Sequence, residues 1–277
     1  MQGGFATKKS AEVALRAAAV AADEGRLVGR SSVTVAAYLG EWLENQRANL
    51  RATTHSGYSR AVALVVSCVG ARALQSLTPL DVESMYARLL SSGRRNGGAS
   101  SAKTVRHGHT VLRRALADAE RLGLVARNAA AGPPALNRVE FPTWSSDELG
   151  AFLEFVADDR LSAAWVLLAS TGMRRGEVLG LRSVHVDFDD ASLSVASSLT
   201  TVGNVPVFSE PRTVKSRRRI SLDRETVEEL RRHRKRQRVE KVAAGPAWAS
   251  EADLVFIDEL GGLVNPDWFA REFRPIV

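Results

Sequence analysis

A short segment of small residues and prolines divides this chain into two parts with different hydrophobic patterns. The segment covers residues 129–142 and has the sequence AAAGPPALNRVEFP. Such a composition is typical of a linker, because proline breaks regular hydrogen bonding and small side chains build little core. Before the segment, apolar residues recur at helical spacing, whereas strand-like runs follow it. The 277 residues are enough for two domains, and we place the linker at 131–142.

The part before the linker predicts an all-α domain over residues 33–130. Thr78 and Pro79 form a clear helix start, with threonine as the cap and proline in the first helical position. Gly123 ends the last helix of this part. The expected helices cover residues 34–50, 54–66, 79–90 and 104–122. Within residues 1–32, the sequence predicts an Ala-rich helix at 8–24, which a polar, glycine-containing stretch follows.

The part after the linker, residues 143–277, predicts helices around a small sheet. Ser146 is expected to cap the first helix, and Gly172 to close the second. Three runs rich in Val, Ser and Thr predict a three-stranded antiparallel sheet with Gly203-Asn204 in its first turn. These runs cover residues 192–202, 205–209 and 217–222; a long basic helix after Asp223, a short strand at 253–257 and a helix at 266–273 complete the pattern. The predicted fold class is mainly α with a small antiparallel β-sheet (α+β).

The charge distribution points to an anionic partner. The chain carries 38 Lys and Arg against 31 Asp and Glu, and 32 of the basic residues are arginines. Residues 1–142 have a net charge of +9 and residues 212–241 a net charge of +8, with acidic stretches after each block. Arginine binds phosphate through a planar fork. A coding bias is the alternative explanation, since the chain is also rich in alanine.

Several function classes are excluded by what the chain lacks. Cys68 is the single cysteine, so neither an intramolecular disulfide nor a thiolate metal cluster can form. The five histidines show no metal-ligand spacing with carboxylates. The longest apolar run is far too short to span a bilayer, and the N-terminus has no signal-peptide core. We therefore expect a cytoplasmic protein that holds no metal and contacts no membrane.

Residues 171–181, TGMRRGEVLGL, are the most informative segment of the chain. Gly172 ends an apolar helix, so Arg174 emerges at the helix end, and Glu177 lies three residues on and can hold its guanidinium. The glycines that follow allow another backbone, such as that of a nucleic acid, to come close. An arginine oriented by a carboxylate is what a phosphoryl-transfer site needs, because it neutralises phosphate charge without titrating. The same spacing also fits a helix-capping ion pair.

These residues identify a resemblance to the tyrosine recombinases, the phage-integrase family. Residues 171–187 resemble the family pattern T-G-[LM]-R-x-[GS]-E-x-x-x-L-x-W-x-D-[IV]-D, with Ser183 and His185 as departures. Residues 211–222, PRTVKSRRRISL, resemble its strand turn P-K-T-x-x-S-x-R-x-[IV]-x-L. The four upstream helices resemble the core-binding domain of the family. Residues 3–9, GGFATKK, resemble the end of its arm-type DNA-binding module.

The resemblance implies two domains that clamp duplex DNA at attachment-type sites, together with other recombinase protomers. The family cleaves one strand with a tyrosine, forms a 3′-phosphotyrosyl bond and rejoins the strand, without metal, ATP or small-molecule cofactor. Arg174 would bind the scissile phosphate, Glu177 would orient it, and a lysine on the β-turn would protonate the leaving 5′-hydroxyl. Residues 1–32 would be a remnant of the arm module and its linker helix, 33–130 the core-binding domain, and 143–277 a partial catalytic domain.

Two departures from the family pattern affect catalysis. Arg212 occupies the position of the family's lysine, and Lys215 lies three residues away, so either residue could take that role. The His-x-x-Arg motif and the nucleophilic tyrosine of the family are not present, and the tyrosines at 38, 58 and 86 all lie in the helical domain. We expect a recombinase without its last catalytic elements, which binds DNA without cleaving it. A non-catalytic DNA-binding product or an inactive remnant of a mobile element is the alternative.

The expected DNA contacts lie in both parts of the chain. On the helix at 104–122 they are Lys103, Thr104, Arg106, His109 and Arg113, and beside the turn they include Arg217. A further basic run at 231–238 covers too many sides of its helix to form one docking surface. Each group could also be a solvated helix face.

Overall fold

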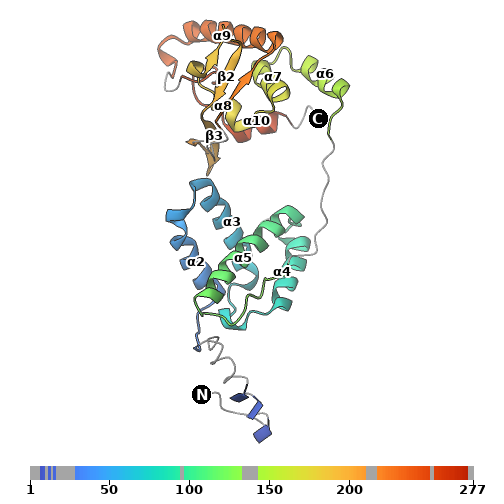
Figure 1. Cartoon of the computed structure of the whole chain (residues 1–277), viewed down its shortest axis with the longest axis vertical. Coiled ribbons are helices and arrows are strands. Elements are labelled where there is room, and N and C mark those ends of the chain that lie inside the picture. The colour runs from blue at the N-terminus through green and yellow to red at the C-terminus, as the bar shows by residue number, and fades with distance from the viewer. Residues whose placement is uncertain are drawn as a thin grey trace. The chain divides into compact units, whose positions relative to one another are not determined.

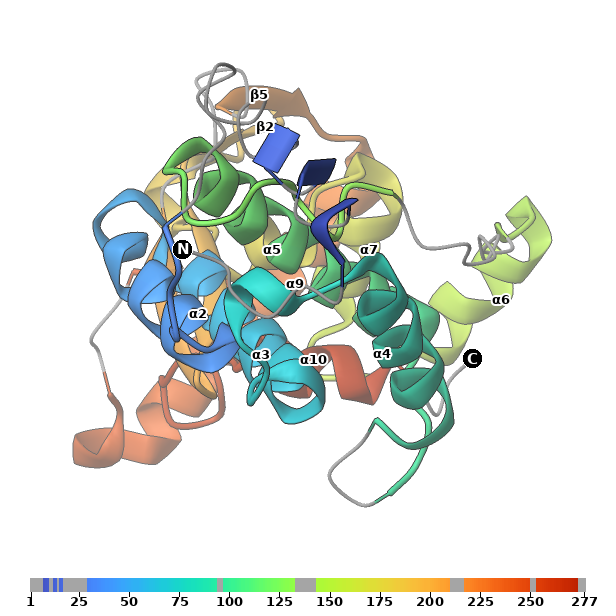
Figure 2. The same ribbon diagram turned by 90° about the horizontal axis from the view of Figure 1, so that it is seen from below.

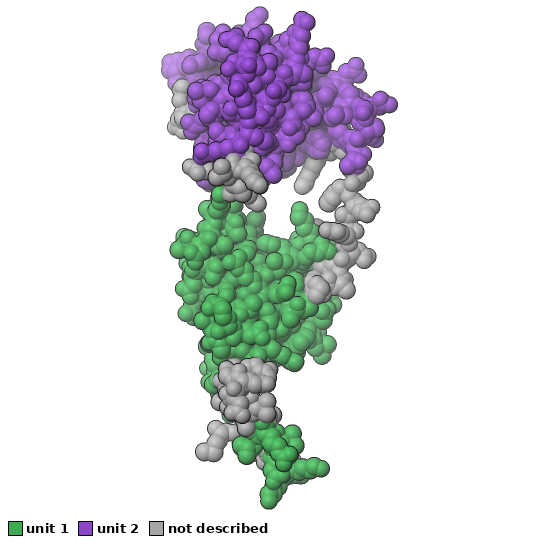
Figure 3. Space-filling model, in the orientation of Figure 1, with its two compact units in different colours: residues 1–139 green, residues 140–277 purple. Residues whose placement is uncertain are grey.

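The computed structural model describes residues 7–9, 12–13, 15–16, 29–93, 97–132, 143–209, 217–249 and 253–273 (Figure 1). Contacts between residues divide the chain into two units, 1–139 and 140–277 (Figure 3). The predicted linker at 131–142 lies almost entirely outside the described residues. Each unit has its own hydrophobic core.

Four α-helices carry most of the core of the first unit, and three of them begin at a residue whose side chain caps the helix. They are α2 (Val35–Asn45), α3 (Ala52–Val69), α4 (Pro79–Ser92) and α5 (Ala102–Arg121). The side chains of Thr34, Thr78 and Ser101 accept backbone N–H groups at the starts of α2, α4 and α5. Helices α2 and α4 lie on either side of α3 and α5 (Figures 1 and 2). No strand is present in the described part of this unit, apart from an isolated bridge between Thr34 and Ala73.

Polar groups at the edge of this core fix α2 against α5. Tyr38 is buried, and its Oη donates to the carbonyl of Ala115 at 2.6 Å. Trp42 Nε1 donates to Asp118 Oδ2 at 2.9 Å. Since the polar atoms of Tyr38 and Trp42 both have partners on α5, these two bonds set the register of the two helices and leave neither donor unpaired.

The second unit packs helices around two small antiparallel sheets. Its helices are α6 (Ser146–Phe155), α7 (Ser162–Thr171), α8 (Arg175–Leu179), α9 (Arg224–Ala244) and α10 (Pro266–Glu272). Its strands are β1 (Val186–Asp187), β2 (Ser192–Val195), β3 (Ser198–Val202), β4 (Val205–Ser209) and β5 (Arg218–Ser221). One sheet has the order β1-β2-β5, and β3 and β4 form a separate hairpin. In the core, the rings of Trp165 and Phe269 stack with centroids 4.0 Å apart.

The structure confirms the predicted fold class, a mainly helical chain with a small antiparallel sheet, but corrects details of the second unit. The cap of α6 is Ser145, not Ser146, because Glu148 three residues later completes a reciprocal capping box with it. The segment at 253–257 is not a strand, since Leu254 and Ile257 make only isolated bridges. The expected turn is present: Gly203 and Asn204 both have positive φ, as a type I′ hairpin requires.

The predicted strand at 192–202 is wrong as a single strand. It breaks after Val195, so β2 joins one sheet and β3 the other. The break brings β3 against α8, where a Cβ on Gly180 would lie 2.7 Å from the backbone nitrogen of Leu199. Ser197 Oγ also donates to the carbonyl of Gly180 at 2.6 Å. Packing against α8 therefore overrides the continuous strand pattern.

Gly180→Ala tests this close approach. Because the added methyl group would overlap the β3 backbone, we expect the variant to lower the free energy of unfolding by about 2 kcal/mol. Gly150→Ala is the matched control, since Gly150 lies exposed on α6 with open space around it, and should stabilise by about 0.5–1 kcal/mol. Denaturant unfolding followed by tryptophan fluorescence measures both, because four of the five tryptophans lie in this unit. Equal effects of the two substitutions would contradict the packing argument.

Candidate functional site

Arg174 stands at the junction between α7 and α8, held by a buried carboxylate. Gly172 closes α7 in the left-handed conformation, with φ of 61°, and the chain turns directly into α8. The backbone N–H of Arg174 donates to Glu177 Oε2 at 2.9 Å, and its Nη1 donates to Oε1 at 2.8 Å. The side chain of Glu177 is only 7% exposed, whereas that of Arg174 is 76% exposed. The pair both starts α8 and presents a guanidinium to solvent.

A second arginine binds the same carboxylate from the sheet. Arg218 lies at the start of β5, and its Nη2 and Nη1 donate to Glu177 Oε2 and Oε1 at 2.9 and 3.4 Å. Our sequence reasoning did not select Arg218, although the arginine of the strand-turn pattern falls on this position. Alternation along a strand was a further signal, since Arg218 and Ile220 are half-buried while Arg217 and Arg219 are exposed.

The two arginines keep Glu177 ionised. Burial by itself raises the pKa of this carboxyl group, but hydrogen bonds from Arg218 and from the backbone and side chain of Arg174 outweigh it and lower the pKa below its usual range. One carboxylate between two guanidinium groups leaves an excess positive charge at this surface. Such an arrangement can bind an oxyanion and stabilise charge that develops on it.

Gly176 and Gly180 of the motif allow close contact with the protein's own backbone. We expected Gly176 and Gly180 to allow the approach of another backbone, such as nucleic acid. The backbone that approaches is β3: a Cβ on Gly176 would lie 2.5 Å from the carbonyl oxygen of Leu199. These glycines thus fix α8, and with it Glu177, against the hairpin.

The basic segment that precedes β5 in the chain is only partly described. Arg212 and Lys215, the two candidates for the lysine role, lie outside the described residues. Arg217 is the first described residue after them and is exposed. The structure therefore brings together Arg174, Glu177 and Arg218, with Arg217 adjacent in the chain.

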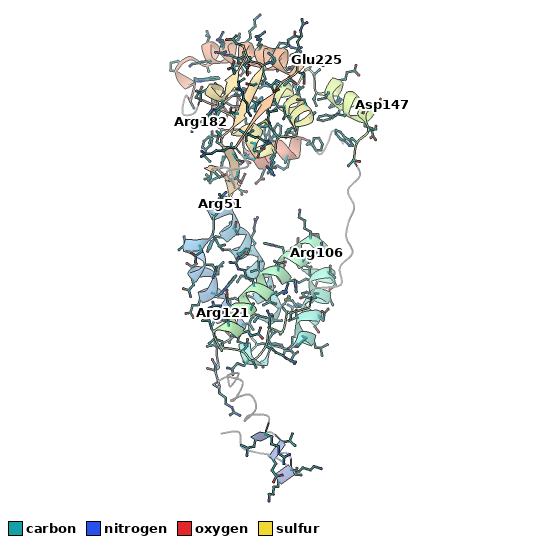
Figure 4. All side chains as sticks on the ribbon, viewed as in Figure 1. Arg51, Arg106, Arg121, Asp147, Arg182 and Glu225 are labelled. Carbon is teal, nitrogen blue, oxygen red and sulfur yellow. The ribbon has the colours of Figure 1, made fainter. Side chains whose placement is uncertain are left out.

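In the first unit, basic residues follow one face of α5. Lys103, Arg113 and Arg114 are exposed and Arg106 is half-buried. Spacings of three and seven residues place Lys103, Arg106 and Arg113 on one side of the helix, and Arg114 follows Arg113 directly. Arg106 and Arg121 lie toward opposite ends of the helix (Figure 4). Arg114 also bonds Tyr58 of α3, with Nη1 2.9 Å from Oη. Thr104 is exposed near the start of the helix.

His109 faces the core of the first unit instead of this surface. It is 5% exposed, and its Nδ1 lies 2.5 Å from Oη of Tyr86 on α4. Burial and the charge of Arg113 lower the pKa of His109, which keeps the ring neutral. Its position on the apolar side of α5 explains the difference from our expectation, and we remove it from the candidate DNA contacts.

The basic run of α9 is largely engaged within its own unit. Arg231 and Arg234 lie over the ring of Phe188, with their Cζ atoms 5.9 and 5.5 Å from its centroid. Arg232 pairs with Glu229 at 2.5 Å, and Arg236 Nη1 donates to the carbonyl of Asp159 at 2.9 Å. Four of the six basic side chains at 231–238 thus have intramolecular partners, which argues against one docking surface there.

Among the described residues, no group of three or more His, Cys, Asp or Glu side chains could hold a metal ion. In the same part of the chain, no helix is both long enough and apolar enough to cross a membrane.

Comparisons with known proteins support the predicted resemblance. No family model matches the chain. The chain is 26% identical over 217 residues to a tyrosine recombinase XerC-like protein of Caldanaerobacter subterraneus, covering 72% of this chain and 54% of that protein. It is also 26% identical over 217 residues to the integrase of Mycobacterium phage L5, covering 77% and 56%. The chain thus spans about half the length of these curated relatives.

Solved structures show the same fold. The Tn1549 transposon integrase in complex with a circular intermediate DNA matches with a TM-score of 0.73 and 19% identity, over 89% of this chain and 78% of that one. A lambda integrase tetramer bound to a Holliday junction matches with a TM-score of 0.62 and 14% identity, over 99% and 74%. Both the sequence resemblance and the fold class predicted from the residues are confirmed.

The ionised state of Glu177 gives a pH-dependent prediction. Because its pKa is lower in the folded chain than the ordinary 4.5, its stabilising contribution is complete above about pH 4.5 and is lost as the pH falls through the folded pKa. We expect Glu177→Gln to lower the free energy of unfolding by about 2 kcal/mol at pH 7. The difference from wild type should shrink steadily below pH 4.5.

Denaturant unfolding from pH 7 to pH 3 measures this difference. Glu154→Gln, at an exposed position on α6, is the control and should match wild type throughout. A Glu177→Gln difference that stays constant over this range would contradict the argument.

Proposed function

We propose that this chain, similar in sequence to tyrosine recombinases and built on the integrase fold, binds duplex DNA and places a backbone phosphate against Arg174. The observation that carries the proposal is the buried carboxylate of Glu177, which holds an arginine side chain that stays 76% exposed. An exposed guanidinium in a fixed position contacts non-bridging phosphate oxygens with little loss of side-chain freedom. In a recombinase reaction, the same contact would stabilise the extra charge on a pentacoordinate phosphate.

The first unit would add contacts along the DNA backbone. Lys103, Arg106 and Arg113 follow one side of α5, and Thr104 is exposed near its start. Their side chains suit phosphate contacts, which give affinity without reading sequence. Arg217, exposed beside the candidate phosphate site, would act in the same way in the second unit.

The general acid of a strand-cleavage step would come from the basic turn. A lysine can transfer a proton to a leaving 5′-hydroxyl, whereas the guanidinium of an arginine does not deprotonate in proteins. Of Arg212 and Lys215, we propose Lys215 for this role. Arg212 would remain a phosphate ligand.

We propose that the chain as given binds DNA without cleaving it, because each of its three tyrosines serves the first unit. Tyr38 and Tyr86 are buried and hydrogen-bonded. Burial raises the pKa of Tyr38 to about 12 and raises that of Tyr86 as well, which disfavours a nucleophilic phenolate. Tyr58 stacks on Trp42, with ring centroids 6.0 Å apart, and accepts from Arg114.

A second partner would be another protomer. The structural match to a lambda integrase tetramer on a Holliday junction supports assembly on paired sites as part of this proposal. An active recombinase of this type would exchange strands within such an assembly. The chain's own contribution, in this view, is site binding and phosphate orientation.

Arg174→Ala tests the proposal. We expect the dissociation constant for a duplex of about 30 base pairs to rise at least tenfold, since charge-assisted hydrogen bonds to phosphate contribute about 1.5–3 kcal/mol. The slope of log Kd against log salt concentration should fall by about 0.9, which corresponds to one phosphate contact. Fluorescence anisotropy at several salt concentrations measures both quantities.

Arg224→Ala is the matched control, because Arg224 is exposed on α9 and pairs only with Glu228 within the described part of the chain. This variant should bind like wild type. Wild-type affinity and slope in Arg174→Ala would reject Arg174 as the phosphate ligand, and no duplex binding by the wild-type chain at low salt would reject the function.

A further inference from the structure

We propose that Arg218 is a positioning residue, which holds Glu177 so that Arg174 keeps its phosphate-binding orientation. The proposal rests on the proposed function, since it concerns how the same site is set. It assigns different tasks to two arginines that share one carboxylate. Arg174 would contact the phosphate, and Arg218 would act through Glu177.

The hydrogen bonds on Glu177 support this division. Each carboxylate oxygen receives one donor from each arginine: Oε1 from Arg174 Nη1 and Arg218 Nη1, and Oε2 from the Arg174 backbone and Arg218 Nη2. Contacts from two directions fix both the position and the rotation of the carboxylate. Without Arg218, only Arg174 would hold it, and the buried carboxylate would lose half of its charge-assisted bonds.

Exposure and donor use distinguish the two arginines. The side chain of Arg218 is 32% exposed and sets both Nη atoms of its fork against Glu177. The side chain of Arg174 is 76% exposed, and only its Nη1 bonds Glu177 within the described part of the chain. The guanidinium of Arg174 therefore has donors to offer a phosphate, while that of Arg218 is directed at the protein.

The sheet makes Arg218 a rigid support. Arg218 pairs with Val195 of β2, and Val195 is 2% exposed in the core of the second unit. The ion pair thus ties α8, which carries Glu177, to β5, 41 residues later in the chain. In the chain, β5 directly follows the segment that contains Arg212 and Lys215. The carboxylate that orients Arg174 would therefore be bonded to the strand next to that segment.

Three consecutive arginines provide an internal set of controls. Arg217 is exposed and is proposed to contact phosphate directly. Arg218 bonds Glu177. Arg219 points to the other face of the strand, where it bonds Asp190 and, at 3.0 Å, Ser192 Oγ. An alanine substitution at each of these positions removes one positive charge from neighbouring residues of the chain. The three substitutions should nevertheless differ in effect: loss of a direct contact at Arg217, loss of positioning at Arg218 and no change in DNA binding at Arg219.

A double-mutant cycle separates positioning from direct contact. Duplex binding by fluorescence anisotropy is measured for the wild-type full chain, Arg174→Ala, Arg218→Ala and the double variant. We expect Arg218→Ala to weaken binding about three- to tenfold. In the Arg174→Ala background, the same substitution should cause no further loss, because the residue through which it acts is gone.

The controls exclude general effects of charge and folding. Arg217→Ala should weaken binding by the same factor in both backgrounds, and Arg219→Ala should leave binding unchanged. Thermal unfolding of each variant checks that the protein is folded, and Arg218→Lys replaces Arg218→Ala if the alanine variant is not. Arginine side-chain NMR measures the rotation rate of the Arg174 guanidinium. This rate should rise in the Arg218 variant, whereas a role of Arg218 in stability alone would leave it unchanged.

Two results would overturn the proposal. Equal losses from Arg218→Ala in both backgrounds would make Arg218 a direct phosphate ligand, and wild-type binding by a folded Arg218→Ala variant would remove it from the site. In both cases the Arg174→Ala variant would still bind duplex DNA more weakly than wild type. If Arg174→Ala itself binds like wild type, the proposed function fails at that point, so the two failures are distinguished.

Discussion

The buried carboxylate of Glu177 is the interaction on which the site depends. A carboxylate with 7% exposure is costly unless cations and N–H groups replace the lost water, and the fold supplies Arg174 from its own helix and Arg218 from β5. This requirement joins a helix start to a sheet. The close approach of α8 to β3 at Gly176 and Gly180 serves the same end, because it fixes the short helix that carries the carboxylate.

The pairing of Arg174 with Glu177 could be predicted from the sequence, whereas the contact of Arg218 with Glu177 could not. Arg174 and Glu177 are three residues apart after a helix-ending glycine, so the local geometry follows from spacing. Arg218 reaches Glu177 only because β5 pairs with β2, and that register depends on the whole second unit. For the same reason the start of α4 was predicted correctly, since Thr78 and Pro79 mark it locally. The break between β2 and β3 was missed, since it results from packing against α8.

Basic charge in this chain has at least three physical uses, which a count of residues does not separate. On α9, Arg231 and Arg234 cover the ring of Phe188, and Arg236 bonds a backbone carbonyl, so these charges stabilise the unit itself. On α5, Lys103 and Arg113 are exposed on one side, where they can meet an external anion. Arg218 belongs to a third group, the arginines that hold another ionised side chain in place.

The same distinction separates Arg174 from His109, although the sequence analysis predicted a contact with DNA for both residues. Burial removes a polar group from any partner outside the protein unless an opening leads to it, and the ring of His109 is enclosed beside Tyr86. Exposure alone is also insufficient, because a freely moving arginine loses side-chain entropy when it binds. Arg174 combines an exposed guanidinium with a backbone N–H and Nη1 that are both fixed to Glu177. A phosphate ligand needs both properties at once, and among the described arginines that bond Glu177, Arg174 is the more exposed one.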